Sequence, residues 1–277
     1  MTRVAILHPG RMGAIVGGQA RAGGAFVGWC PTGRSADTAR RAAAAGLTAV
    51  DDLRTLLDSS DVVISLCPPA AAERVAEEVA GCSYRGIFVE ANAISPGRTE
   101  KIAGLMDAEV VDGCVIGPPP AEPRLARLYL SGAGAERVAS IFSGTFLEAR
   151  VIEGAVGKAS ALKVAFASFN KAAQALAAIS YALADHYGLR AELEAEARFH
   201  DGFALARPGS LPGSAARGWR WAPESQEAAR TLEEAGLPAD FALAAAEVFE
   251  RWAPVKDDFD VDLDTVLRLL QRPSAIK

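Results

Sequence analysis

The sequence has no run of lysine or arginine that would form a basic stripe, and its formal net charge at pH 7 is −5. Basic stripes bind nucleic acid and anionic membrane surfaces, so neither is an expected partner. No uninterrupted apolar run approaches the about 20 residues that a membrane-spanning helix needs. The first apolar stretch, residues 4–7, is too short for the hydrophobic part of a secretion signal. We therefore expect a cytoplasmic protein whose partners are small molecules.

Cysteine is scarce as well. The four cysteines, Cys30, Cys67, Cys82 and Cys114, are scattered without the short spacing of metal ligands. Free cysteines are commonly buried, and those of cytosolic proteins stay reduced. We expect packing thiols and no metal site.

Half of the 277 residues are hydrophobic, and a chain of this length suggests two domains. In the first half, short apolar runs alternate with helical patterns, which indicates βαβ units and a Rossmann-like, doubly wound parallel sheet. The runs are residues 4–7, 25–30, 48–50, 62–66, 86–90, 110–116 and 128–130. The pattern changes near Glu153, and the rest looks helical. We predict an α/β nucleotide-binding domain over residues 1–153 and an all-α dimerisation and substrate domain over residues 154–277.

A long helix is predicted at the start of the second domain. Residues 157–187 are rich in alanine and contain no proline and no internal glycine, which allows some eight helical turns. Apolar side chains occur on most of the helix circumference, so the helix must be covered on nearly all sides. One small domain can hardly do this, and we therefore predict a homodimer.

The N-terminal stretch VAILHPGRMGAIVGG (residues 4–18) resembles the Gly-x-Gly-x-x-Gly loop of dinucleotide-binding domains, but His8 stands at the first glycine position. The second glycine lets the backbone approach the pyrophosphate, and the third lets the helix pack close to the strand. Gly10 and Gly13 supply both. Proline at the next position can preset the tight turn through its fixed φ. The candidate cofactor residues of this loop are His8, Pro9, Gly10, Arg11, Met12 and Gly13.

The next strand end carries no acid where an NAD site would hold the ribose 2′-hydroxyl, because no Asp or Glu occurs before Asp37. Thr32, Arg34 and Ser35 occur there instead. A guanidinium and two hydroxyls suit a 2′-phosphate, which favours NADP(H) as cofactor. The alternative is that Arg34 and Ser35 begin a solvated helix, with Ser35 as its N-cap.

Three further stretches, VEANAISPGRTEKIA (89–103), VDGCVIGPPP (111–120) and GAVGKASALKVAFASFNK (154–171), occur in this order. With the N-terminal loop they resemble the β-hydroxyacid dehydrogenases, the superfamily of 6-phosphogluconate and 3-hydroxyisobutyrate dehydrogenases, whose architecture imine reductases share. Together with GWRWAPESQEAARTLEEAGLPADFALAAAEVFERWA (218–252), they are similar to the subgroup in which a 6-phosphogluconate-dehydrogenase-like domain is joined to a C-terminal domain of unknown function.

The resemblance implies that Lys163 is the general acid/base, because it follows Gly157 as the family lysine does. Ala167 stands where the family has an asparagine that holds the substrate. Asn170 lies within about 20° of the helix face of Lys163, two turns further along, and could replace that amide. Without the resemblance, Lys163 is the one cation between Lys158 and Lys171 on an otherwise apolar helix, and extending its ammonium to solvent is the alternative interpretation.

The substrate segment departs from the family pattern. Ile116, Gly117 and Pro118 replace the family's Ser-Gly-Gly, which argues against the usual carboxylate clamp. Asn92 and the following alanine replace a Ser-Thr pair near the nicotinamide ribose, and the Asn side chain can still donate and accept there. Cys67 and Pro68 are further candidates for the cofactor site. In the second domain the candidates are Lys171 and Trp221, in a cluster of Trp219, Arg220, Trp221 and Glu224 placed in a loop, with His200 upstream.

The residues predict an NADPH-dependent oxidoreductase that transfers a hydride between the nicotinamide and a small hydroxy or keto compound. Lys163 handles the proton in this interpretation, with Asn170 beside the substrate. Two alternatives stay open: an imine reductase, and a redox-inert NADPH-binding regulatory protein.

Overall fold

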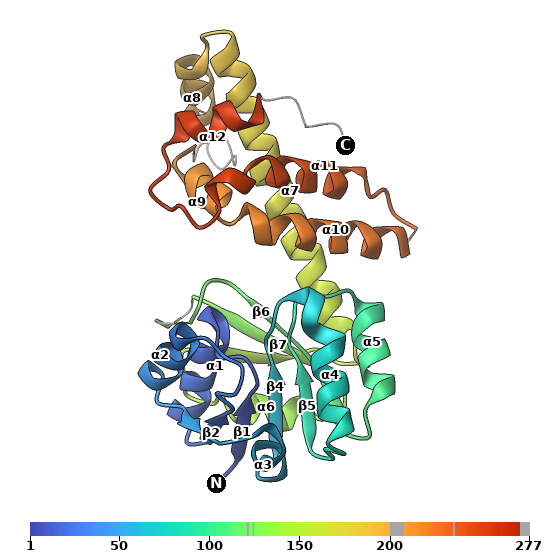
Figure 1. Ribbon diagram of the computed structural model, residues 1–277. Coiled ribbons are helices and arrows are strands. Elements are labelled where there is room, and N and C mark those ends of the chain that lie inside the picture. The colour runs from blue at the N-terminus through green and yellow to red at the C-terminus, as the bar shows by residue number, and fades with distance from the viewer. Residues whose placement is uncertain (121, 124, 200–207, 235, 272–277) are drawn as a thin grey trace. The chain divides into compact units, whose positions relative to one another are not determined.

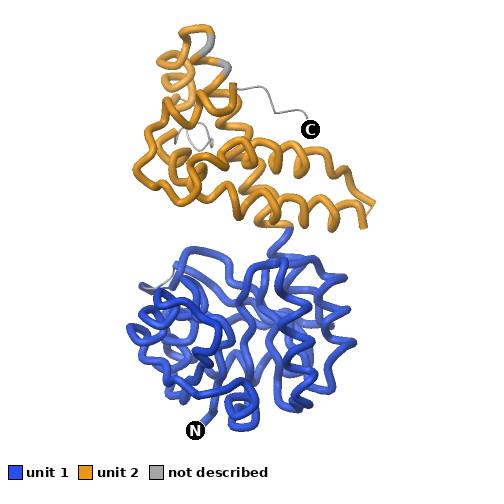
Figure 2. Tube along the Cα trace, in the orientation of Figure 1, with its two compact units in different colours: residues 1–164 blue, residues 165–277 orange. Residues whose placement is uncertain are grey.

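The computed structural model describes residues 1–120, 122–123, 125–199, 208–234 and 236–271. The chain divides into two compact units, residues 1–164 and residues 165–277 (Figure 2). The division falls inside a long helix, whereas the boundary predicted from sequence, between residues 153 and 154, falls just before that helix.

The first unit alternates strands and helices as predicted. In chain order its elements are β1 (Arg3–Ile6), α1 (Arg11–Ala22), β2 (Phe26–Trp29), α2 (Ala36–Ala44), β3 (Thr48–Ala49), α3 (Leu53–Asp58), β4 (Val62–Ser65), η1 (Pro69–Ala71), α4 (Ala72–Gly81), β5 (Ile87–Glu90), α5 (Pro96–Leu105), β6 (Glu109–Ile116), β7 (Arg127–Ser131), α6 (Ala135–Ser140) and β8 (Glu148–Val151). Within the described residues, the strands form one 8-stranded sheet in the order β3-β2-β1-β4-β5-β6-β7-β8 (Figure 1).

The predicted doubly wound sheet is confirmed, with one strand pair of opposite direction. All neighbouring strands are parallel except β6 and β7, which pair antiparallel, as in Cys114 opposite Tyr129. Strand β8 was not predicted. Its Glu148 and Arg150 are charged and its pattern lacks a fully buried residue, because it lies at the sheet edge.

Alternate residues of each central strand face opposite sides of the sheet. Val4 and Ile6 of β1 pack with helices α1, α2 and α6, whereas Ala5 packs with α3, α4 and α5. Strands buried on both faces appear in sequence as continuous apolar runs, which is why these strands were predictable. The two helical layers leave the carboxyl ends of the strands open to carry a site.

The second unit is helical throughout the residues that the structure describes. It contains the larger part of α7 (Lys158–His186), followed by α8 (Arg190–Phe199), η3 (Pro208–Ser210), α9 (Leu211–Ala216), α10 (Gly218–Glu234), α11 (Asp240–Arg251), η4 (Ala253–Val255) and α12 (Leu263–Leu270). Its core surrounds Trp252, whose indole Nε1 donates to the carbonyl oxygen of Val266 at 3.0 Å. The prediction of a loop at residues 219–224 is wrong, because these residues lie in the first turns of helix α10. A Cβ at Gly218 would lie 2.8 Å from the Phe249 carbonyl oxygen, so this glycine allows α10 and α11 to pack closely.

None of the helices within the described ranges has the length and apolar character that crossing a membrane requires.

Candidate functional site

The turn between β1 and α1 keeps two of the three fingerprint features. A Cβ at Gly13 would lie 2.2 Å from the carbonyl oxygen of His8, so only glycine lets the helix pack this close to the turn. A Cβ at Gly10 would meet nothing within 4 Å, so the backbone there faces open space. These are the two glycine roles that a dinucleotide loop needs.

The N-terminus of α1 is suited to an anion. Gly10 is its N-cap, and no side chain caps this end among the described residues. The first N–H groups of an uncapped helix are donors without an intrahelical partner, and the helix dipole favours negative charge there. The open backbone at Gly10 and this helix end therefore fit a pyrophosphate.

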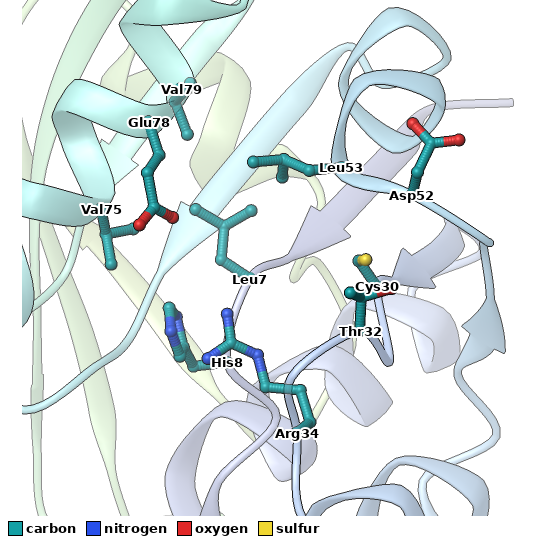
Figure 3. Close-up of a pocket in the computed structure, with 10 residues that line it drawn as sticks. All are labelled: Leu7, His8, Cys30, Thr32, Arg34, Asp52, Leu53, Val75, Glu78 and Val79. Carbon is teal, nitrogen blue, oxygen red and sulfur yellow. The ribbon is translucent and has the colours of Figure 1, made fainter.

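A pocket opens beside this turn, near the carboxyl ends of β1 and β2 (Figure 3). Strand order reverses between β1 and β4, which is the position where open α/β sheets bind ligands. One group of lining residues is apolar and suits a planar base, and a second group is polar. The apolar residues are Leu7, Leu53, Val75 and Val79, and the polar ones are His8, Cys30, Thr32, Arg34, Asp52 and Glu78.

Arg34 and Thr32 are placed together, as the NADP(H) interpretation requires. Figure 3 shows the Arg34 side chain extending toward the His8 ring. The Thr32 hydroxyl donates to the Asp51 carbonyl oxygen at 3.1 Å and retains its acceptor capacity. Ser35 caps α2 by accepting from the Thr38 N–H at 3.3 Å, which is the structural role that the sequence left open.

Two acids that the sequence did not single out also line the pocket. Asp52 caps α3 by accepting from the Thr55 N–H at 2.9 Å, and hydrogen bonds from Thr55 lower the pKa of Asp52. Glu78 pairs with Arg74 one helical turn earlier. Both carboxylates therefore have partners of their own, the Thr55 N–H for Asp52 and the Arg74 guanidinium for Glu78. The Arg34 side chain lies beside His8.

His8 is neutral at pH 7 in this setting. Burial, then the charges of Arg34 and Arg74, lower the pKa of His8 from its ordinary 6.5 to about 4. The His8 Nδ1 atom is buried without a hydrogen-bond partner in the described part of the chain.

Asn92 links the ends of two strands. Its buried side chain accepts from the Cys67 N–H at 2.5 Å through Oδ1 and donates to the Ser65 hydroxyl at 3.1 Å through Nδ2. It thereby holds the turn that leads into Pro68. Burial, followed by the charge of Glu90, raises the pKa of the Cys67 thiol to about 11, so this thiol is neutral.

Lys163 lies in the first unit, at the carboxyl end of β6. Its ammonium nitrogen donates to the carbonyl oxygen of Val115 at 2.8 Å. Ile116, Gly117 and Pro118 follow directly. Gly117 has φ +122°, and a Cβ there would lie 2.3 Å from the Leu125 carbonyl oxygen, so the segment requires glycine for its shape.

A buried carboxylate fixes the start of the lysine helix. Asp112 of β6 accepts from the Gly157 N–H at 2.9 Å, the Ser160 N–H at 2.9 Å and the Ser160 hydroxyl at 2.6 Å. Sequence reasoning missed Asp112, although an acid inside an apolar strand is a visible signal. The same signal marks Glu90, which lies opposite Asp112 in the β5–β6 pairing.

The remaining predicted site residues lie in the second unit. Asn170 is exposed on α7. Lys171 is buried, and its ammonium lies 2.6 Å from Glu224 Oε2. The Trp221 ring packs edge-on against Phe249, with ring centroids 5.4 Å apart. His200 lies outside the described residues.

Comparison with known proteins identifies relatives of this chain. Residues 184–252 match the family described as a domain of unknown function (DUF1932). An uncharacterized 28.5 kDa protein of Methanothermus fervidus is 32% identical over 165 residues, which make up 59% of this chain. The match spans 64% of that relative, less than two thirds of its length.

Solved structures share the fold. The conserved protein MTH1747, of unknown function and described as similar to 3-hydroxyacid dehydrogenases, is 25% identical, with a TM-score of 0.71 over 91% of this chain and 97% of that one. Mycobacterium tuberculosis 3-hydroxyisobutyrate dehydrogenase with L-serine is 21% identical, with a TM-score of 0.76 over 98% and 100%. A reductive aminase from Aspergillus terreus, in complex with NADPH and ethyl levulinate, is 17% identical, with a TM-score of 0.51 over 97% and 99%.

The chain therefore has the fold of the 3-hydroxyacid dehydrogenases, which imine reductases share, and its residues 184–252 are similar to the DUF1932 domain.

Proposed function

We propose that this protein is an NADP(H)-dependent oxidoreductase that interconverts a small hydroxy compound and the corresponding keto compound. The observation that carries the proposal is the position of Lys163, whose ammonium is held by the Val115 carbonyl at the same edge of the sheet as the nucleotide turn. The nicotinamide, when bound, supplies or accepts the hydride.

Lys163 manages the proton in this proposal. An ammonium carries three N–H donors, and Lys163 can give a proton to a substrate oxygen. In the reductive direction, the carbonyl carbon gains a hydride and its oxygen gains the Lys163 proton. In the oxidative direction, the lysine takes that proton back.

The preference for NADP(H) is supported by Arg34 and Thr32 in the pocket beside β2. Arginine binds phosphate oxygens in a forked geometry. The Thr32 hydroxyl can donate to a further phosphate oxygen once it gives up its hydrogen bond to the Asp51 carbonyl oxygen. The bound NADPH of the reductive aminase is consistent with this choice.

Substrate contacts are proposed for two groups of residues. Ile116, Gly117 and Pro118 present no hydroxyl, which favours a substrate that does not depend on a carboxylate clamp. In the second unit, Asn170, Lys171 and Trp221 are the candidates. A homodimer and a cytoplasmic location complete the proposal.

Two alternatives have specific support. Similarity to the reductive aminase favours imine reduction on the same scaffold. The absence of the family's substrate-binding serine and asparagine favours a redox-inert NADPH-binding regulatory protein. Purified protein tested for NADPH oxidation with keto acids, aldehydes and cyclic imines, and for NADP reduction with hydroxy acids, separates the three. Turnover of cyclic imines alone indicates the first alternative, and NADPH binding without any turnover indicates the second.

A further inference from the structure

His8 is the residue by which this turn departs most from a dinucleotide-binding fingerprint, and its surroundings suggest a use. The residue follows the end of β1, where the fingerprint has glycine, and its ring lines the pocket that Thr32 and Arg34 also line (Figure 3). The Arg34 side chain extends toward this ring at the wall of the same pocket, so an anion that binds Arg34 there would also meet the imidazole.

We propose that His8 is a specificity-determining residue of the nucleotide site: its imidazole binds the same adenosine 2′-phosphate as Arg34 and takes up a proton when that phosphate binds. The inference rests on the proposed use of NADP(H). It adds a residue by which the site would distinguish NADP(H) from NAD(H).

The charges around His8 explain the proton uptake. Arg34 approaches from the loop after β2, and Arg74 from α4. Asp52 and Glu78 line the same pocket, and the Cys30 thiol lies at the end of β2. Asp52 caps α3 and Glu78 pairs with Arg74, and burial of the ring, followed by the charges of Arg34 and Arg74, keeps the free imidazole neutral. A phosphate dianion reverses this balance, because it neutralises the guanidinium groups and attracts an imidazolium.

Affinity for the 2′-phosphate should increase as the pH falls. The pKa of His8 is about 4 in the free protein and rises in the complex. Between these two values, binding takes up a proton, so affinity for the 2′-phosphate increases as the pH falls through the higher value. A ligand without the 2′-phosphate lacks this linkage.

The experiment uses the full chain with two probes, adenosine 2′,5′-bisphosphate and ADP. The chain contains three histidines, so NMR can follow the imidazole signals as pH changes, and His8→Gln identifies the His8 signal. We expect the 2′,5′-bisphosphate to raise the pKa of His8 by roughly 2.5 units, which brings it above about 6, and ADP to leave it nearly unchanged. Calorimetry in buffers of different ionisation enthalpy should show proton uptake with the first probe only.

Variants of His8 distinguish the titration of its imidazole from that of the phosphate, whose second pKa is about 6. Between about pH 8 and about pH 6, the affinity ratio of the wild-type protein to His8→Gln for the 2′,5′-bisphosphate should rise roughly threefold or more. Arg34→Gln should weaken this probe, while Arg40→Gln, on the exposed face of α2, serves as the matched control. His8→Asn provides a second variant if His8→Gln is unstable.

The outcomes are distinguishable. Binding of the 2′,5′-bisphosphate with an unchanged His8 titration overturns the inference and leaves the proposed cofactor intact. An equal pKa rise with ADP assigns His8 to the pyrophosphate and also overturns it. If neither probe binds, the proposed function and the inference both fail.

Discussion

The ammonium nitrogen of Lys163 lies 2.8 Å from the carbonyl oxygen of Val115, so the first turns of α7 are tied to the carboxyl end of β6. The contact joins residues 48 positions apart in the chain. It places the only lysine between Lys158 and Lys171 next to the segment of residues 116–118 that follows β6.

Replacing Lys163 by methionine should lower kcat by about 10²- to 10⁴-fold, because a general acid/base contributes that much to the rate. Methionine keeps most of the side-chain length and removes the proton donor. NADPH affinity should change little. The measurement is steady-state turnover of a substrate that the wild-type protein accepts, with NADPH binding followed by fluorescence.

Lys158→Met is the control for this variant, since Lys158 is exposed at the start of the same helix. Lys171 is less suitable because its ammonium pairs with Glu224 and the substitution would disturb the second unit. Near-normal turnover by Lys163→Met would refute the assigned role.

Arg34→Ala should narrow the preference for NADPH over NADH. Loss of a charge-assisted hydrogen bond to phosphate costs about 1.5 to 3 kcal/mol, or roughly ten- to hundredfold in affinity. Titration calorimetry with both cofactors measures the ratio, and Arg40→Ala should leave it unchanged. An intact protein that binds both cofactors equally contradicts the prediction.

Two glycines of the nucleotide turn should respond differently to alanine. Gly13→Ala places a Cβ 2.2 Å from the His8 carbonyl oxygen, so the turn must shift and the protein should lose both stability and nucleotide binding. Gly10→Ala meets no atom within 4 Å and should cost about 1 kcal/mol or less as a change of N-cap.

Gly10→Ala should nevertheless weaken nucleotide binding, because its methyl group enters the space through which the backbone approaches the pyrophosphate. Urea unfolding and calorimetry with NADPH separate the two effects. Undiminished NADPH affinity in Gly10→Ala would place the nucleotide elsewhere.

The buried Glu90 should make stability depend on pH. Burial raises the pKa of Glu90 from 4.5 to about 8, and its Oε2 has no hydrogen-bond partner within the described residues. The folded protein therefore holds this proton more tightly than the unfolded chain, and the Glu90 contribution to stability is lost as pH rises from about 4.5 to about 8. Glu90→Gln should flatten this dependence and be the more stable form near pH 8. Urea unfolding at several pH values between about 4.5 and about 8 measures the free energy of unfolding of both proteins. The same pH dependence in both would contradict the prediction.

A dimer is expected from the apolar surface of α7. Phe166, Phe169, Leu176 and Ile179 are exposed in the single chain, with Phe169 75% exposed. Phe166, Phe169 and Leu176 lie within about 80° of one another around the helix. Burying such a face in a second copy is typical of obligate homodimers.

Light scattering at low micromolar concentration should report about twice 28.9 kDa for the wild-type protein. Phe169→Glu should shift the mass toward the monomer, whereas Phe146→Glu, at an exposed residue of the first unit, should not. A wild-type monomer would exclude the dimer.

Local patterns explain what could be predicted. Strands β1, β2, β4, β5 and β6 are largely buried on both faces, so they appear as short apolar runs, and α7 appears as a long stretch without proline. Gly10 and Gly13 were recognisable because their spacing reflects backbone geometry within one turn. Strand β8 and the helical start at Gly218 were not, since edge burial and helix packing depend on distant partners.

The sequence by itself determined the Rossmann-like sheet, the helical second part and the identity of Lys163, because burial periodicity and motif spacing are properties of neighbouring residues. Only the tertiary structure decided that His8 lies beside Arg34, that Asp112 anchors the start of α7, and that β7 runs antiparallel to β6. These relationships join residues 11 to 48 positions apart. They depend on how the layers pack, and no local preference of the chain encodes that packing.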